Sequence, residues 1–150
     1  MIRSTVDRKY TFMDFVTGGM EINFVVAIDF TASNGSPTEP KSLHYNQPSR
    51  LTTNQYVQAI RAVGDIVQDY DTDKLFPVYG FGARIPPQGQ VSHMFPCNFN
   101  YQNPFVEKVQ GIIDIYRSSV AQIQLYGPTN FAPVISQTAA MARREIEDGK

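Results

Sequence analysis

The chain has 150 residues and a formal net charge of -1, with 42% hydrophobic and 18% charged residues. This composition predicts one ordinary globular domain and argues against intrinsic disorder. Because the sequence carries no basic excess, it lacks the charge with which proteins bind nucleic acid or anionic lipid through counterion release, and no nucleic-acid partner is expected.

Three features of the sequence indicate where the protein works. Cys97 is the only cysteine, so an internal disulfide is impossible and a reducing compartment is favoured. The first residues, Met1 to Tyr10, are polar and mixed in charge, without the apolar core of a signal peptide. The longest apolar run, Phe24 to Ile28, is too short to span a bilayer. A cytoplasmic location is therefore expected.

The N-terminal part of the chain is predicted to lead into a buried strand. Residues 1–12 are expected to be a linker or tail, and residues 13–150 to form the domain. The run Ile22–Asp29 is almost entirely apolar and partly β-branched, which predicts a strand buried on both faces of a parallel sheet. A long polar loop with Gly35 and three prolines follows over residues 34–50.

The first helix is predicted to run from a cap at Thr52 or Thr53 to about Tyr70. Its apolar residues recur at three- and four-residue spacing, which is typical of one buried stripe on an amphipathic helix. The stripe consists of Tyr56, Ala59, Ile60, Val63, Ile66, Val67 and Tyr70.

Two strands and two helices are predicted for the second half of the chain. Leu75–Phe81 indicates a strand, and Val91–Phe95 a short strand at an edge, after a proline-containing loop. A second helix ends before the segment 127–130, and a third runs from about Phe131 to Glu147. The expected inward residues are Val109, Ile112, Ile113, Tyr116, Val120 and Ile123 in the second helix, and Val134, Ile135, Thr138 and Ala142 in the third.

This order of elements predicts an α/β fold. Helices that alternate with buried apolar strands favour a doubly wound, mostly parallel sheet flanked by helices. In such sheets, ligands bind beyond the carboxyl ends of the strands, where the chain order reverses. The first predicted strand ends at Asp29, so the residues directly after it are the first candidates for a functional site.

Asp29, Thr31 and Ser33 stand at alternate positions directly after the first predicted strand. Alternate side chains of an extended segment point the same way, so a carboxylate and two hydroxyls can converge on one ion. Oxygen ligands with little net charge suit Mg²⁺ or Mn²⁺. The same pattern also occurs by chance, and the alternative is a turn in which Asp29 and Ser33 bond to main-chain groups.

The segment Ile28-Asp29-Phe30-Thr31-Ala32-Ser33-Asn34-Gly35 resembles the copine family's version of the metal-ion-dependent adhesion site. Further blocks resemble the same family in the same order and extend the likeness over about residues 11–149. They are Ser42-Leu43-His44-Tyr45, Tyr70-Asp71-Thr72-Asp73-Lys74, Phe76-Pro77, Gly80-Phe81-Gly82-Ala83, Val91-Ser92-His93 and the segment Leu125 to Pro133.

The resemblance implies a copine-type von Willebrand A domain whose metal site is built from three loops. Asp29, Thr31 and Ser33 match the first-loop motif, and Thr129 matches the second-loop threonine. The family's third loop, a Thr-Asp-Gly segment after a further strand, is not found up to Lys150, so the domain is expected to be C-terminally incomplete. Loss of that outer ligand predicts a weak or empty Mg²⁺ or Mn²⁺ site.

The same missing strand has a structural consequence. In the family it lies beside the first strand, so Ile22 to Ile28 is expected to present an apolar edge without a partner. Such an edge favours pairing between molecules, and self-association of the chain is expected.

Other candidate sites are weaker. Asp69, Asp71 and Asp73 imitate the start of an EF-hand loop, but the required glycine and glutamate are absent, and a charged turn after a helix is the better account. His44 and His93 have no Cys or Glu at metal-ligand spacing and are expected to be loop or packing residues. Cys97 has no base or oxyanion hole near it in the sequence, so a structural or surface thiol is expected.

The resemblance implies a protein-interaction domain of a calcium-dependent phospholipid-binding protein, not an enzyme. The ion would take a carboxylate from an acidic side chain of a protein partner. Lipid binding in the family is attributed to modules upstream of this domain, so membrane association, including association with the plasma membrane, is expected only of a full-length relative. The alternative is a metal-dependent hydrolase or phosphotransferase that uses Asp29, although no partner acid or nucleophile is evident. No catalytic residue and no organic cofactor are predicted.

Overall fold

The fold is built around one central strand, β2, Leu75–Phe81. The computed structural model describes residues 9–20, 22–47, 54–87 and 89–147. β2 pairs in parallel with β1, Val26–Asp29, placing Ile28 opposite Gly80. It also pairs antiparallel with β5, Phe95–Pro96, and with β6, Phe105–Glu107. The central sheet therefore mixes both strand directions.

A second, smaller sheet continues the chain from β2. β3, Ala83–Arg84, pairs antiparallel with β4, Val91–Ser92, and with β7, Gln124–Leu125. Beyond β7, Thr31 and Tyr126 form an isolated parallel bridge. This small sheet holds the segment after β7 next to the segment after β1.

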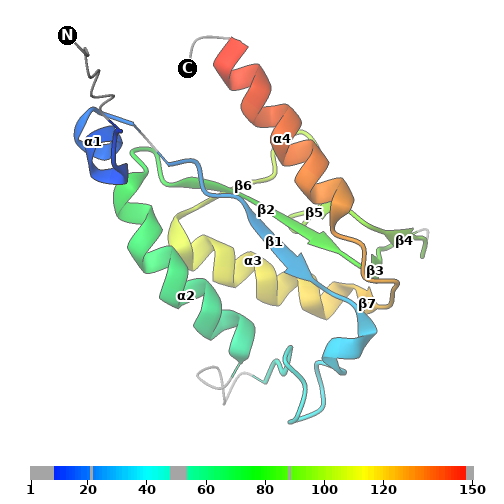
Figure 1. Cartoon of the computed structure of the whole chain (residues 1–150). Helices are drawn as coiled ribbons and strands as arrows, with labels where there is room; N and C mark the ends of the chain where they lie inside the picture. Colours follow the sequence, from blue (N-terminus) through cyan, green and yellow to red (C-terminus); the bar gives the residue numbers. More distant parts are fainter. Residues whose placement is uncertain (1–8, 21, 48–53, 88, 148–150) are drawn as a thin grey trace, which may run out of the picture.

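The helices lie on both faces of the central sheet (Figure 1). α2, Gln55–Val67, and α3, Lys108–Gln122, cover one face, and α4, Ala132–Glu147, lies across the other. The alternation of β2 agrees with this, because Phe76 and Val78 pack with α2 and α3 whereas Tyr79 and Phe81 pack with Val134 of α4. The prediction of an α/β fold flanked by helices is confirmed.

A mostly parallel, doubly wound sheet is not confirmed. Among the paired strands that the structure describes, only β1 and β2 run parallel. Parallel neighbours need a long crossover connection, but the chain from β3 to β6 returns through short turns, so its strands run antiparallel to their neighbours. The segment predicted as one strand at Val91–Phe95 is divided between β4 and β5 by a turn.

The predicted buried stripe of α2 is partly wrong. The buried residues are Val57, Ile60 and Gly64, whereas Ile66 is 65% exposed. Ala59, Val63 and Tyr70 are also exposed. Two apolar stripes at helical spacing coexist in this segment, and the one carrying Gly64 is buried because a glycine there admits Val109 of α3. The helix is capped by Asn54, while the predicted caps Thr52 and Thr53 lie outside the described residues.

The predictions for the two later helices are mostly confirmed. α3 buries Val109, Ile112, Ile113, Tyr116 and Val120, as expected. In α4, Val134 is buried and Thr138 half-buried, but Ile135 is 59% exposed and Ala142 is exposed. The inward face of α4 follows positions 134, 138 and 141, since the hydroxyl of Tyr79 contacts the Met141 sulfur at 3.7 Å.

Two N-terminal features complete the fold. α1, Phe12–Thr17, is capped by Thr11, so an ordered helix begins at the end of the predicted tail. β1 starts at Val26 rather than Ile22, and within the described ranges no strand pairs with the edge of β1 that faces away from β2. Self-association through this edge stays a prediction.

No helix within the described ranges has the length and apolar character that crossing a membrane requires.

Alanine substitutions at two helical glycines, Gly64 in α2 and Gly111 in α3, are expected to change the free energy of unfolding in opposite directions. A Cβ at Gly64 would lie 2.8 Å from Cγ2 of Val109, whereas a Cβ at Gly111 would meet nothing closer than 3.4 Å. Alanine is favoured over glycine in a helix by about 1 kcal/mol, and overpacking a tight core contact costs about 1–3 kcal/mol. Gly111→Ala should therefore raise the free energy of unfolding in urea, and Gly64→Ala should lower it. Equal increases in both variants would contradict the close packing of the two helices.

Candidate metal centre

The candidate site begins where β1 ends. Asp29 is the last residue of β1, and its Oδ1 accepts hydrogen bonds from the Thr31 amide at 2.8 Å and the Thr31 hydroxyl at 2.7 Å. The segment Ala32–Asn34 then forms one turn of 3₁₀ helix, which brings the Ser33 Oγ to 3.1 Å from the Thr31 Oγ1. The three residues of the alternating motif are thus in contact with one another.

Thr129 reaches the same point from the other end of the chain. Its hydroxyl donates to the Thr31 Oγ1 at 3.2 Å, across 98 residues of sequence. The segment is held there by main-chain bonds, since the Tyr126 amide donates to the Gly82 carbonyl at 3.0 Å and the Ala32 amide to the Tyr126 carbonyl at 2.6 Å. The structure therefore brings together all four residues that the sequence singled out.

The four side chains form a partly open cluster of oxygen atoms. Thr31 is 2% exposed and lies innermost, Asp29 is half-buried, and Ser33 and Thr129 are exposed. The Thr31 hydroxyl has one proton and two lone pairs, yet polar atoms of Asp29, Ser33, Asn34 and Thr129 all lie within 3.3 Å of it. Three of these atoms are oxygens and the fourth is Asn34 Nδ2, an amide donor, so one carboxylate oxygen and the hydroxyls of Thr31, Ser33 and Thr129 gather at one point.

The chemistry of the donors fits Mg²⁺ or Mn²⁺. One carboxylate and three hydroxyls are hard ligands of low total charge, and such ions keep water or an external group in their remaining positions. Within the described part of the chain, no three His, Cys, Asp or Glu side chains gather as a metal-binding group. A cation here would be held by Asp29, Thr31, Ser33 and Thr129, and it would act as a Lewis acid toward an outside oxygen ligand.

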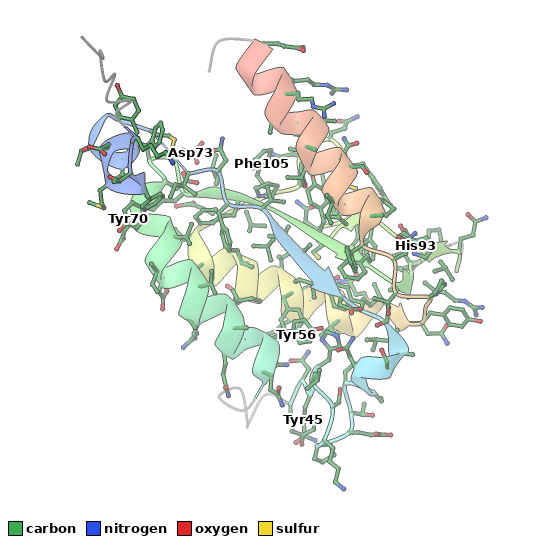
Figure 2. All side chains as sticks on the ribbon, in the orientation of Figure 1. Tyr45, Tyr56, Tyr70, Asp73, His93 and Phe105 are labelled. Atoms are coloured by element: carbon green, nitrogen blue, oxygen red, sulfur yellow. The ribbon has the colours of Figure 1, made fainter. Side chains whose placement is uncertain are left out.

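A group of buried residues supports the cluster from behind. The main-chain carbonyl of Asp29 accepts from His44 Nε2 at 2.7 Å and from the Tyr56 hydroxyl at 3.0 Å. Tyr56 lies at the N-terminal end of α2, at the same end of the molecule as Tyr45 and opposite Tyr70 and Asp73 (Figure 2). Burial raises the pKa of Tyr56 well above its usual value, with a smaller contribution from the Asp29 charge, so the phenol remains protonated and can donate.

Sequence reasoning missed this supporting group. His44 was expected to be a loop or packing residue, and it is fully buried, but its bond to Asp29 spans 15 residues and that of Tyr56 spans 27. No spacing rule connects such positions. The sequence did contain one indication, since Tyr56 and Tyr116 belong to the apolar stripes that were predicted to face inward. A tyrosine hydroxyl that faces inward needs a hydrogen-bond partner.

The other candidates have structural roles. Burial raises the pKa of the Cys97 thiol to about 12, an effect that the Ser119 hydroxyl only partly offsets, so Cys97 is a core residue and a poor nucleophile. The Asp71 and Asp73 carboxylates accept from the amides of Lys74 and Leu75 at 3.0 and 2.8 Å, which confirms the predicted turn. His93 is half-buried in the turn between β4 and β5.

Comparison with known families decides the membership of this chain. The family model described as Copine matches residues 42–150, which is more than half of the chain. The chain belongs to the copine family. The matched region contains Thr129, His44 and Tyr56, while Asp29 to Ser33 lie before its first residue. The predicted copine membership is thereby confirmed, and the match covers the blocks from Ser42 onward.

Proposed function

We propose that this copine-family chain is a protein-binding domain with a metal-ion-dependent adhesion site. In this proposal Asp29, Thr31, Ser33 and Thr129 hold Mg²⁺ or Mn²⁺, and the ion accepts a carboxylate from an acidic side chain of a protein partner. The observation that carries the proposal is the 3.2 Å contact between the hydroxyls of Thr129 and Thr31, which joins two distant loops at one point.

We also propose that the fold is of the von Willebrand A type. A von Willebrand A-type, doubly wound sheet is supported by the parallel pair of β1 and β2 and by helices on both faces. It is also supported by the place of the cluster, directly beyond the carboxyl end of β1, where open α/β sheets bind their ligands.

The charge of the donor set explains why the partner would be acidic. Asp29 is the only carboxylate among the four ligands, so a divalent ion there would retain a net positive charge. A carboxylate entering its coordination sphere would neutralise that charge in a partly buried setting, where the attraction is stronger than in water. The same low ligand charge predicts weak binding of the ion alone, with a dissociation constant on the order of 10⁻³ M.

The surface beside Thr129 suits such a partner. The Arg84 guanidinium lies 3.9 Å from the centre of the Tyr126 ring, and no carboxylate of a described residue forms an ion pair with it. Phe131 and Ile135, just after Thr129, are 56% and 59% exposed. A cation on the Tyr126 ring and two exposed apolar side chains shortly after Thr129 in the chain favour an acidic segment that also carries apolar residues.

We do not assign membrane binding to the residues of this chain. We assign calcium-dependent phospholipid binding, and with it any association with the plasma membrane, to modules upstream of this domain in a full-length relative. The proposed location is the cytoplasm.

The enzymatic alternative, a hydrolase or phosphotransferase using Asp29, has no observation in its favour. His44 contacts the main-chain carbonyl of Asp29 rather than its carboxylate, so the two residues are not arranged as a general base and its orienting partner. Metal-dependent turnover that Asp29→Ala abolishes would support this alternative over a binding role.

The proposed function is tested by measuring whether binding of acidic peptides to the chain depends on the metal ion. A peptide library with one Asp or Glu between apolar residues would be selected on the chain in the presence of Mn²⁺. Selected peptides should bind the wild type with Mn²⁺, and their affinity should fall at least about 100-fold when EDTA is added or when Asp29 is replaced by alanine, since outer-ligand losses alone cost 10–100-fold. Equal affinity in all three conditions would remove the ion from the interaction.

A further inference from the structure

The main-chain carbonyl of Asp29 has an unusual set of partners for a strand residue. Asp29 is paired with Phe81 of β2, and the Phe30 amide donates to the Phe81 carbonyl at 2.9 Å. Because successive residues of a strand turn their main-chain groups to opposite sides, the Asp29 carbonyl faces away from β2. Side chains bind it there instead, since His44, Tyr56 and Asn34 all direct a polar atom to this oxygen, at 2.7, 3.0 and 3.3 Å.

His44 is held rigidly between aromatic rings. It has no exposed surface, its ring stacks on Tyr56 with centroids 4.1 Å apart, and it stacks on Phe30 at 5.3 Å. Its Nδ1 lies 3.0 Å from the Tyr116 hydroxyl. Burial lowers the pKa of His44, so the neutral ring is favoured, and the tautomer that satisfies both contacts donates from Nε2 to Asp29 and accepts at Nδ1 from Tyr116.

The chain of hydrogen bonds continues into the core and ends at a helix cap. The Asn54 side-chain amide donates to the Tyr116 hydroxyl at 3.0 Å and to the Tyr45 carbonyl at 2.9 Å. The Asn54 Oδ1 accepts from the Val57 amide at 2.9 Å and so caps α2. Hydrogen bonds therefore run in one donor direction from Asn54 through Tyr116 and His44 to Asp29. They connect the N-terminal cap of α2 with the candidate site by way of Tyr116 in α3.

A second branch reaches the centre of the oxygen cluster. The Tyr56 hydroxyl lies 3.2 Å from the Asn34 Oδ1 as well as 3.0 Å from the Asp29 carbonyl. The Asn34 side-chain nitrogen in turn contacts the Thr31 carbonyl at 3.1 Å and the Thr31 hydroxyl at 3.3 Å. The single phenol proton is shared between these two acceptors, so Tyr56 contacts both ends of the segment from Asp29 to Asn34 and donates to one of them at a time.

We propose that His44, Tyr56 and Tyr116 are positioning residues that set the conformation of residues 29–34, and thereby aim the Asp29 carboxylate and the Thr31 hydroxyl at their common point. This inference rests on the proposed metal site for its functional meaning, and on the hydrogen bonds above for its structural content. Groups that orient ligands from behind typically change metal affinity 10–100-fold when removed. Because the network is anchored on α2 and α3, the loop geometry is set before any ion arrives.

The experiment removes single hydroxyls and reads the loop in two independent ways. The variants are Tyr56→Phe, which takes away the direct contact, and Tyr116→Phe, which breaks the relay without touching the loop. Tyr79→Phe is the matched control, because Tyr79 is buried on the α4 face of the sheet, and among the described residues its hydroxyl contacts the Met141 sulfur, away from residues 29–34. The two readouts are amide hydrogen exchange of Thr31 and Asn34 without metal, and the dissociation constant of Mn²⁺ followed by electron paramagnetic resonance.

Tyr56→Phe should speed exchange of the Thr31 amide and raise the Mn²⁺ dissociation constant, each about 10-fold, and Tyr116→Phe should have a smaller effect of about 3-fold. Tyr79→Phe should change both by less than about 2-fold, although all three variants lose one phenol hydroxyl. If Tyr56→Phe does not fold, Tyr116→Phe carries the same comparison.

The outcomes separate this inference from the proposed function. If the wild type binds no Mn²⁺ but exchange at Thr31 rises in Tyr56→Phe and not in Tyr79→Phe, the metal site is wrong and the positioning network stands. If exchange and affinity in Tyr56→Phe and Tyr116→Phe equal those of Tyr79→Phe, the positioning role is overturned, whether or not the wild type binds Mn²⁺.

Discussion

Gly82→Ala is expected to abolish Mn²⁺ binding although it leaves all four proposed ligands in the sequence. A Cβ at Gly82 would collide with the methyl group of Thr31, the innermost residue of the oxygen cluster. The Gly82 main chain cannot move away easily, because its amide donates to the Ser92 carbonyl at 2.9 Å and its carbonyl accepts from Tyr126 at 3.0 Å. Thr31 must therefore shift, and with it the centre of the site.

Gly82→Ala should also destabilise the fold. Gly82 has a φ of +76°, a conformation that costs an L-residue about 1–2 kcal/mol, and the collision adds an overpacking cost of about 1–3 kcal/mol. Gly89→Ala is the matched control, because Gly89 has a φ of +66° but nothing within 4 Å of its Cβ position. The measurements are urea unfolding and Mn²⁺ titration of both variants. Unchanged Mn²⁺ affinity in Gly82→Ala would show that Thr31 does not set the site.

Gly80→Val is expected to unfold the domain. Gly80 is the penultimate residue of β2, and a Cβ there would stand 2.6 Å from ring carbons of both Phe30 and Phe95. The two rings stack with centroids 5.9 Å apart and have no exposed surface, so neither can turn aside without opening the core. Three added carbons cannot be accommodated between them. The cost should exceed about 4 kcal/mol, a large part of the 5–15 kcal/mol that stabilises a typical domain.

A graded series checks this expectation. Gly80→Ala should fold but lose about 2–3 kcal/mol of unfolding free energy, in the range of a strained core insertion. Ala27→Val serves as the control, because Ala27 is an exposed strand residue of β1 and the added methyl groups meet solvent. Circular dichroism and urea titration follow both. A cooperatively folded Gly80→Val with wild-type stability would mean that the Phe30 and Phe95 rings are not packed against β2 as described.

Sequence patterns predicted an element correctly where the residues of that element alone indicate its type. The apolar run of Leu75–Phe81 and the periodic residues of α3 predicted a strand and a helix that the structure contains. The same reasoning was partly wrong for the buried face of α2, where Ile60 is buried as predicted but Val63 and Ile66 are exposed and Gly64 is buried instead. Residue spacing identifies an apolar stripe on a helix. When one helix carries two such stripes, its packing against a neighbouring helix determines which of them is buried.

The candidate site was only half accessible to such reasoning. Asp29, Thr31 and Ser33 could be connected because alternate side chains after a strand share a direction. Thr129 entered only through resemblance to the copine family, and the structure then placed it against Thr31. His44, Tyr56 and Tyr116 could not be connected with the site at all, because their contacts join the loop to helices far along the chain.

The sequence by itself determined the family, most of the helices and strands, and the order of the oxygen-bearing residues, because these depend on a repeat of a few residues or on local motifs. Only the tertiary structure decided that β5 and β6 run antiparallel to β2, which stripe of α2 is buried, and which donors meet at the Asp29 carbonyl. The physical reason is that strand direction, burial and hydrogen-bond partners are set by groups brought together in space, whereas periodicity records only the geometry of the backbone that carries them.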